Sequence, residues 1–122
     1  YQGKYCTIIN SYFLDSSGPN NGYGTLLTNA QMKDRTSYVG WDFFNDDNGS
    51  EDIWYMPIND YPKLKWQALP TDIYLDGIVN LKDYSLLANC WLNNDTSCDL
   101  NNDGMVDTND LQQLAHDWLN NN

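Results

Sequence analysis

Residues 99–110 carry oxygen-bearing side chains at a spacing that is typical of a calcium-binding loop. The run is Asp-Leu-Asn-Asn-Asp-Gly-Met-Val-Asp-Thr-Asn-Asp, with such side chains at positions one, three, five, nine and twelve and a glycine at position six. Ca²⁺ takes about six to eight oxygen ligands, and the glycine permits the sharp turn that aims alternate side chains inward. The alternative is an Asx-rich turn that holds no metal. We expect a calcium site formed by Asp99, Asn101, Asp103, the backbone carbonyl of Met105, Asp107 through a water molecule, and Asp110.

The same pattern occurs once more, 27 residues earlier. Residues 72–94 align with residues 99–121, and eleven of the 23 aligned pairs are identical, which indicates a duplicated supersecondary unit. The earlier loop has Tyr74 at position three, and a phenol is a poor calcium ligand. We therefore expect two calcium sites, of which the 99–110 site is the stronger. The remaining candidate ligands of the earlier loop are Asp72, Asp76, the carbonyl of Ile78, Asn80 and Asp83.

Each loop leads into an amphipathic segment that predicts a helix, over residues 81–92 and 108–119. One apolar stripe follows the helical period in each segment, and neither stripe is large enough to be buried alone. We expect the two helices to pack on each other, antiparallel, in a module of pseudo-twofold symmetry that spans residues 70–122. The stripes consist of Tyr84, Leu87, Ala88 and Trp91, and of Leu111, Leu114, Ala115 and Trp118.

Residues 1–69 form the other half of the chain and are rich in aromatic and β-branched residues. Thr28 and Gln31 have the spacing of a capping box, which predicts a short helix to about Arg35. The large rings favour the aromatic core of a small β-rich unit, and the alternative is a surface that stacks on sugars. The predicted fold class is α+β, with strands expected at residues 5–14, 37–44, 53–57 and 63–67.

Composition argues against several classes of function. The chain has 122 residues and a net charge of −11, and sixteen of its 17 acidic residues are aspartate. Such acidity disfavours binding to nucleic acid or to anionic membrane surfaces, and no apolar run approaches the roughly 18 residues of a membrane span. The chain opens on Tyr1 without an initiator methionine, which suggests a processed or excised piece.

Nothing in the chain has the pattern of a catalytic site, so we expect no enzyme activity. Phosphate-binding loops and nucleophile motifs are missing from the sequence. His116 is the single histidine, and we interpret it as exposed rather than as a zinc ligand, since no four-ligand spacing accompanies it. The acidic side chains of residues 46–52 could form a carboxylate site, but a solvated loop is the simpler interpretation.

Three cysteines are present. Cys90 and Cys98 are close enough in sequence to form a short disulfide, and two free thiols are the alternative. Cys6 has no evident partner, and we expect it to be buried as a small apolar side chain.

The motifs of residues 72–119 closely resemble a type I dockerin. The resemblance rests on the duplicated loop and helix, on Asp rather than Glu at position twelve, and on the form Asp76-Gly-Ile-Val-Asn80 followed by Trp91-Leu92, as in planctomycete-like secreted bacterial proteins. It implies calcium-dependent folding, docking onto a cohesin partner, and an extracellular or cell-surface location. The usual Ser-Thr recognition pair is absent. By this resemblance the partner-binding residues are Leu81, Lys82, Ala88, Asn89, Thr108, Asn109, Ala115 and His116.

A second resemblance concerns the N-terminal half. Residues 7–15 are similar to a rung of the GLUG-motif repeats of large secreted bacterial proteins, and residues 27–66 to the segment that follows the last repeat. This implies the end of a β-solenoid-like array and its cap. Two further functions therefore stand beside docking: an intramolecular calcium-stabilised cap of a β-repeat protein, and a carbohydrate-binding β unit.

Overall fold

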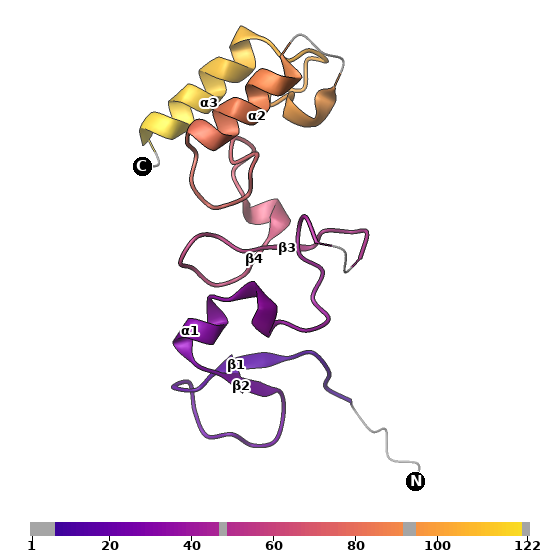
Figure 1. Cartoon of the computed structure of the whole chain (residues 1–122), viewed down its shortest axis with the longest axis vertical. Helices are drawn as coiled ribbons and strands as arrows, with labels where there is room; N and C mark the ends of the chain where they lie inside the picture. The colour runs from indigo at the N-terminus through magenta and orange to yellow at the C-terminus, as the bar shows by residue number, and fades with distance from the viewer. Residues whose placement is uncertain (1–6, 47–48, 92–94, 121–122) are drawn as a thin grey trace.

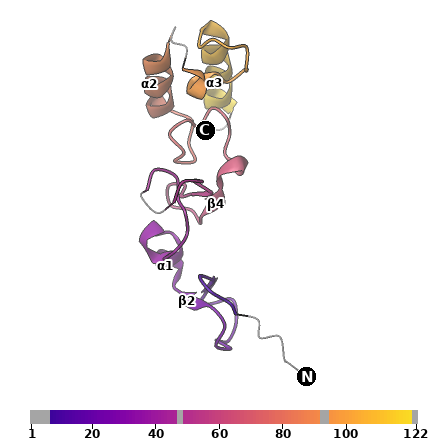
Figure 2. The same ribbon diagram turned by 90° about the vertical axis from the view of Figure 1, so that its right-hand side faces the viewer.

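The computed structural model describes residues 7–46, 49–91 and 95–120. Figure 1 shows an elongated molecule, with short strands toward the N-terminus and a pair of helices at the C-terminal end. The view in Figure 2, turned by 90°, has the same succession along the long axis. The fold therefore contains helices and strands, as the predicted α+β class requires.

The N-terminal half contains two separate pairs of short strands. β1 (Tyr12–Leu14) and β2 (Thr25–Leu27) are parallel, whereas β3 (Trp54–Tyr55) and β4 (Lys63–Leu64) are antiparallel. Between the pairs lies the short helix α1 (Asn29–Met32). The predicted capping box is present, because Thr28 Oγ1 accepts from the Gln31 N–H and the Gln31 side chain accepts from the Thr28 N–H.

The core of this half is aromatic, as the composition predicts. Leu27, Tyr38 and Phe43 are buried, and further rings and methionines pack around them. Trp41 stacks on Trp54 with ring centroids 4.1 Å apart. Tyr38 and Phe43 are thus at the centre of the unit, and the partly buried rings of Tyr12, Trp41 and Trp54 pack against them.

Residues 37–44, predicted as a strand, do not form one. Phe43 makes only an isolated bridge to Trp54, and a 3₁₀ turn covers Arg35–Ser37. The reason is local: Asp34 caps that turn, and Gly40 has φ of +83°, which interrupts an extended run. The aromatic residues reach the core from turns instead. The strand predicted at 5–14 shortens to β1, and the prediction for Cys6 lies outside the described residues.

The C-terminal half consists of α2 (Leu81–Cys90), α3 (Thr108–Asn120) and the two loops that precede them. Figures 1 and 2 show the helices side by side and antiparallel. Four buried residues fall in pairs 27 positions apart: Val79 with Val106, and Leu87 with Leu114. The duplication therefore produces one shared core, to which each unit contributes the same two positions.

The predicted apolar stripes are correct only in part. Leu87 and Leu114 are buried, but Ala88 and Ala115 are exposed and Tyr84 is 44 % exposed. Each helix thus buries a narrower stripe than its sequence period predicts, because it packs on one neighbour rather than inside a larger layer.

A disulfide joins Cys90, the last residue of α2, to Cys98 in the following 3₁₀ turn (Thr96–Cys98). Both cysteines are buried in the shared core. The link between the two units is therefore tied back to the end of the first helix. Among the residues that the structure describes, no helix is long and apolar enough to cross a membrane.

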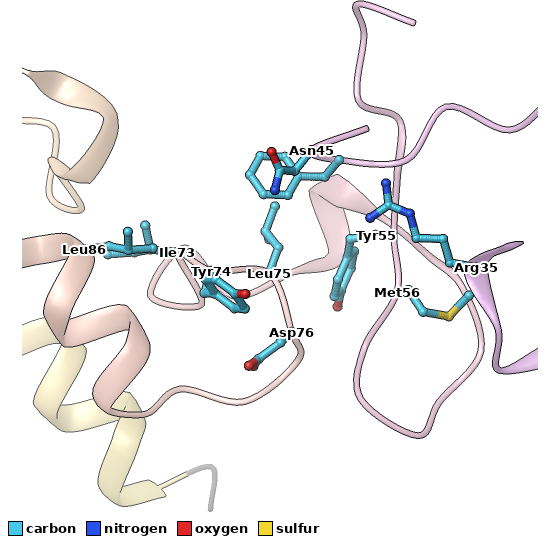
Figure 3. A pocket seen from close by; sticks show the side chains of 10 residues that line it. Arg35, Asn45, Tyr55, Met56, Ile73, Tyr74, Leu75, Asp76 and Leu86 are labelled. Atoms are coloured by element: carbon cyan, nitrogen blue, oxygen red, sulfur yellow. The ribbon is translucent and has the colours of Figure 1, made fainter. Parts of the chain in front are cut away.

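The earlier loop also joins the two halves of the chain. The Ile58 N–H donates to the Asp76 carbonyl at 2.8 Å, and a Cβ added to Gly77 would lie 2.7 Å from the Pro57 side chain. Leu75 adopts φ of +57°, an unfavourable value for leucine, and its side chain lines the cavity shown in Figure 3 together with Tyr55. The loop backbone is therefore seated directly on the N-terminal half.

Candidate metal centre

The 99–110 loop is wound around its own aspartate side chains. Asp99 accepts from the backbone N–H groups of Asp103 and Gly104, at 3.2 and 2.8 Å. Asp103 Oδ1 accepts from Met105 N–H at 3.0 Å, and Asp107 Oδ1 accepts from Asn109 N–H at 2.8 Å. Gly104, at position six, has φ of +94°, which accounts for the glycine there.

Asp110, at position twelve, closes this loop. Its Oδ1 accepts from the N–H groups of Leu100 and Asn101, and its Oδ2 accepts from Asp107 N–H at 2.8 Å. Burial raises the pKa of this carboxyl, but the backbone hydrogen bonds outweigh that effect and hold its pKa below the ordinary value. One fully buried carboxylate therefore holds the start of the loop against the start of α3.

The 72–83 loop repeats this scheme at the equivalent positions. Asp72 accepts from Asp76 N–H and Gly77 N–H, and Asp76 Oδ1 accepts from Ile78 N–H. Asp83 receives hydrogen bonds from the Tyr74 and Asn80 N–H groups, both at 2.8 Å. The backbone at position four has a positive φ in both loops, +57° at Leu75 and +61° at Asn102.

The two loops differ first in the burial of their aspartate side chains. Asp72, Asp76 and Asp83 are all buried, and burial is the main cause that raises the pKa of Asp72. In the later loop Asn101 and Asp103 are exposed, and Asp99 is half-buried.

A lysine side chain marks a second difference. Lys82 Nζ lies 3.0 Å from Asp76 Oδ2 and 4.7 Å from the centre of the Tyr74 ring. The hydrogen bond to Asp76 is the main cause that raises the pKa of Lys82. In the later loop the amide of Asn101 donates to the equivalent oxygen, Asp103 Oδ2, at 2.8 Å.

The predicted ligands do not all converge on one point. Throughout the described ranges, no group of three or more His, Cys, Asp or Glu side chains is gathered closely enough to hold a metal ion. The carboxylates point to backbone N–H groups instead. By its chemistry the 99–110 set fits Ca²⁺, because its members are hard oxygen donors on an already curled backbone. The 72–83 set fits less well. It has the phenol of Tyr74 at position three and the ammonium group of Lys82 at position eleven, where the 99–110 loop has the amides of Asn101 and Asn109.

The residues predicted to contact a partner are all on the surface. Leu81 is 67 % exposed, and the other predicted residues on α2 and α3 are exposed as well. His116 lies on α3, where Asn120 Nδ2 is 3.3 Å from its Nδ1.

A shallow apolar depression lies between the helices, and the sequence did not single it out as a binding feature. It has a volume of about 320 Å³ and is lined by Tyr84, Ala88, Trp91 and Leu111. The sequence assigned three of these residues, Tyr84, Trp91 and Leu111, only to packing between the helices. Their incomplete burial could be recognised only after the helices were placed side by side.

Of the carboxylates at residues 46–52, Asp47 lies outside the described residues, and the described ones gather no metal-binding cluster. Asp42, which the sequence did not single out, accepts from Glu51 N–H, and Asp46 pairs with Arg35 at 3.3 Å. These carboxylates therefore serve loop structure. Trp66 is 78 % exposed and Tyr23 is 64 % exposed, so a sugar-binding surface on this half stays a prediction.

The chain was compared with family models, curated proteins and solved structures, and part of it matches a family model. No curated protein and no solved structure matches the chain. The part of the chain that matches the family model contains both loops, α2 and most of α3. Dockerin type I domains are calcium-binding, non-catalytic modules that dock onto cohesins and are typically extracellular. Residues 70–117 of this chain match the family model of the dockerin type I domain.

Proposed function

We propose that residues 70–122 form a calcium-stabilised docking module for a cohesin-type partner in a secreted bacterial protein. The observation that carries the proposal is the hydrogen-bond scheme that the two loops share at an offset of 27 residues. Such a scheme fixes the backbone of each loop in the curled form that a calcium loop needs, with the aspartates of positions one, five and twelve on that curl.

Calcium would act by neutralising charge that opposes compaction. Residues 70–122 contain nine aspartates against a single lysine, so their net charge is −8. Asp99, Asp103, Asp107 and Asp110 would hold the ion in the later loop with Asn101 and the Met105 carbonyl, and the earlier loop would provide a weaker site. The bound ion favours the folded state by mass action and fixes the start of each helix.

Docking requires an accessible surface on the folded helices. Predicted contact residues on both helices are exposed, and the depression lined by Tyr84, Ala88, Trp91 and Leu111 lies between them. Apolar contact area with a polar rim is typical of protein–protein interfaces. The same module repeats these positions on both helices, so either unit could present them.

A second candidate is an intramolecular cap, in which the module closes a β-repeat region. The seating of the earlier loop on Pro57 and Ile58 favours it. The parallel pairing of β1 with β2 is also the arrangement of successive rungs in a β-solenoid. In this proposal residues 1–69 are the end of a GLUG-type repeat region, and residues 70–122 cover it.

Circular dichroism and thermal melting of the full chain, with calcium or with chelator, test the metal. We expect chelator to lower helix content and melting temperature. The variant Asp103→Asn should weaken the calcium effect, whereas Asp95→Asn, outside both loops, should not. A melting temperature that is unaffected by chelator contradicts the calcium proposal.

Binding to a panel of type I cohesin modules separates docking from capping. If the helices dock, Ala88→Arg should abolish binding and Gln112→Arg, at another exposed position, should preserve it. Calcium-dependent stability without binding to any cohesin would favour the cap.

A further inference from the structure

The two loops differ in what satisfies one carboxylate oxygen. Asp76 and Asp103 both stand at position five, and Oδ1 of each accepts the N–H two residues onward. Oδ2 of Asp103 faces the neutral amide of Asn101 at 2.8 Å. Oδ2 of Asp76 faces the ammonium group of Lys82 at 3.0 Å. A positive charge of the chain itself therefore lies on the earlier loop, at an oxygen that calcium would need.

Tyr74 completes the seat of this ammonium group. Lys82 Nζ lies 4.7 Å from the centre of the Tyr74 ring, within the range of a cation–π interaction. The residue that removes a calcium ligand from position three thus provides a contact for the lysine at position eleven. The net charge of residues 72–83 is −2, from three aspartates and one lysine, and that of residues 99–110 is −4, from four aspartates.

We infer that Lys82 is a built-in cation that replaces calcium in the 72–83 loop, so that the chain binds one calcium ion tightly, in the 99–110 loop. This rests on the proposed calcium function of the later loop. An ion that entered the earlier loop would have to displace Lys82 from Asp76 and to remain beside its ammonium charge. Both requirements weaken calcium binding there.

The position of Asp76 gives this replacement a consequence for the whole chain. Its carboxylate is held by Lys82, while its backbone carbonyl accepts from Ile58 N–H at 2.8 Å. Figure 3 shows Tyr74, Leu75 and Asp76 around the same cavity as Tyr55 of the N-terminal half. A loop that is closed by its own lysine keeps the junction between the halves intact when calcium is absent. Calcium then controls the later loop without loosening the junction.

Isothermal titration of the calcium-depleted full chain with CaCl₂ measures the number and affinity of ions. We expect one tight ion in the wild type. Lys82→Gln removes the competing charge and should strengthen binding to the earlier loop by about tenfold or more at low salt. The double variant Tyr74→Asn/Lys82→Gln restores the amide at position three and should show two tight ions.

A matched control is available in Lys65. Its Nζ also pairs with a carboxylate, Asp52 at 3.8 Å, and lies 4.8 Å from the centre of the Phe44 ring, and neither of these partners belongs to a candidate calcium loop. Lys65→Gln should leave the titration unchanged. Amide exchange of Ile58 gives a second readout: its protection should persist in chelator in the wild type and fall in Lys82→Gln.

The outcomes separate this inference from the proposed function. Two ions of similar affinity in the wild type, or a change of less than twofold in the earlier loop on Lys82→Gln, would overturn the inference. Absence of calcium binding to the later loop in the wild type would overturn the proposed calcium function. Retention of the later ion in every variant shows that the module remains folded.

Discussion

Asp110→Asn tests whether the position-twelve carboxylate stabilises the loop without metal. The Asp110 side chain is fully buried and accepts three backbone hydrogen bonds, from Leu100, Asn101 and Asp107. Asparagine preserves its shape but can accept on only one of the two terminal atoms. At least one buried N–H would then face an amide NH₂ group. Since a hydrogen bond to a charged group contributes about 1.5–3 kcal/mol, we expect a loss of about 2–3 kcal/mol.

The assay is urea unfolding in chelator, followed by far-ultraviolet circular dichroism. With an m-value of about 1.5 kcal/mol/M, this loss shifts the unfolding midpoint down by about 1–2 M. Asp107→Asn is the matched control, because it makes the same chemical change in the same loop. Among the described residues Asp107 Oδ1 accepts from one group, the Asn109 N–H, and asparagine caps helices as well as aspartate does. Its effect in chelator should stay below about 0.5 kcal/mol.

The earlier loop supports this choice of control, since Asn80 occupies the position equivalent to Asp107 and caps α2. With calcium present, the Asp107→Asn variant should no longer be nearly as stable as the wild type. Asp107→Asn, nearly silent in chelator, should lose part of the calcium-dependent stabilisation. If Asp110→Asn and Asp107→Asn unfold at the same midpoint in chelator, the carboxylate has no metal-independent role and the reasoning is refuted.

Three further predictions concern the same half of the chain. Burial raises the pKa of Asp110, but its backbone hydrogen bonds lower that pKa more. The stabilisation from the Asp110 carboxylate is therefore present above the pKa of the unfolded state and is lost as pH falls through the lower pKa of the folded state. In chelator, the difference in free energy of unfolding between the wild type and Asp110→Asn should shrink below about pH 4. Reduction of the Cys90–Cys98 disulfide, which spans a sequence separation of 8, should lower the free energy of unfolding by about 2.5 kcal/mol, measured by urea titration with and without reductant. Leu114→Ala, at a site 1 % exposed, should cost about 2–5 kcal/mol in the same assay, whereas Leu119→Ala, 82 % exposed, should cost less than about 0.5 kcal/mol.

The features that the sequence predicts best are set by local spacing. The Thr28 capping box, the start of α2 at Leu81 and the start of α3 at Thr108 depend on residues within three or four positions of one another. The loop pattern is equally local, because each aspartate accepts from N–H groups a few residues away. Such features need no knowledge of the rest of the fold.

The features that the sequence predicts poorly depend on tertiary contacts. Residues 37–44 have the composition of a strand, yet Tyr38 and Phe43 are buried without forming one. The width of each helix stripe depends on the number of neighbours that the helix packs against, which the period does not reveal. Lys82 was interpreted from the family pattern as a partner contact, and its reach to Asp76, six positions earlier, follows from the curl of the loop.

Duplication explains how the two loops could diverge without loss of the fold. The buried pairs Val79–Val106 and Leu87–Leu114, together with the position-twelve carboxylates, form the framework that both units share. Positions three and eleven lie outside this framework. They can therefore differ, with Asn101 and Asn109 in one loop and Tyr74 and Lys82 in the other, while the position-twelve carboxylate still accepts from the N–H groups of positions three and nine in both loops. Under the proposed calcium function, the charge at position eleven distinguishes a loop that binds calcium from a loop of the same shape that is closed by its own lysine.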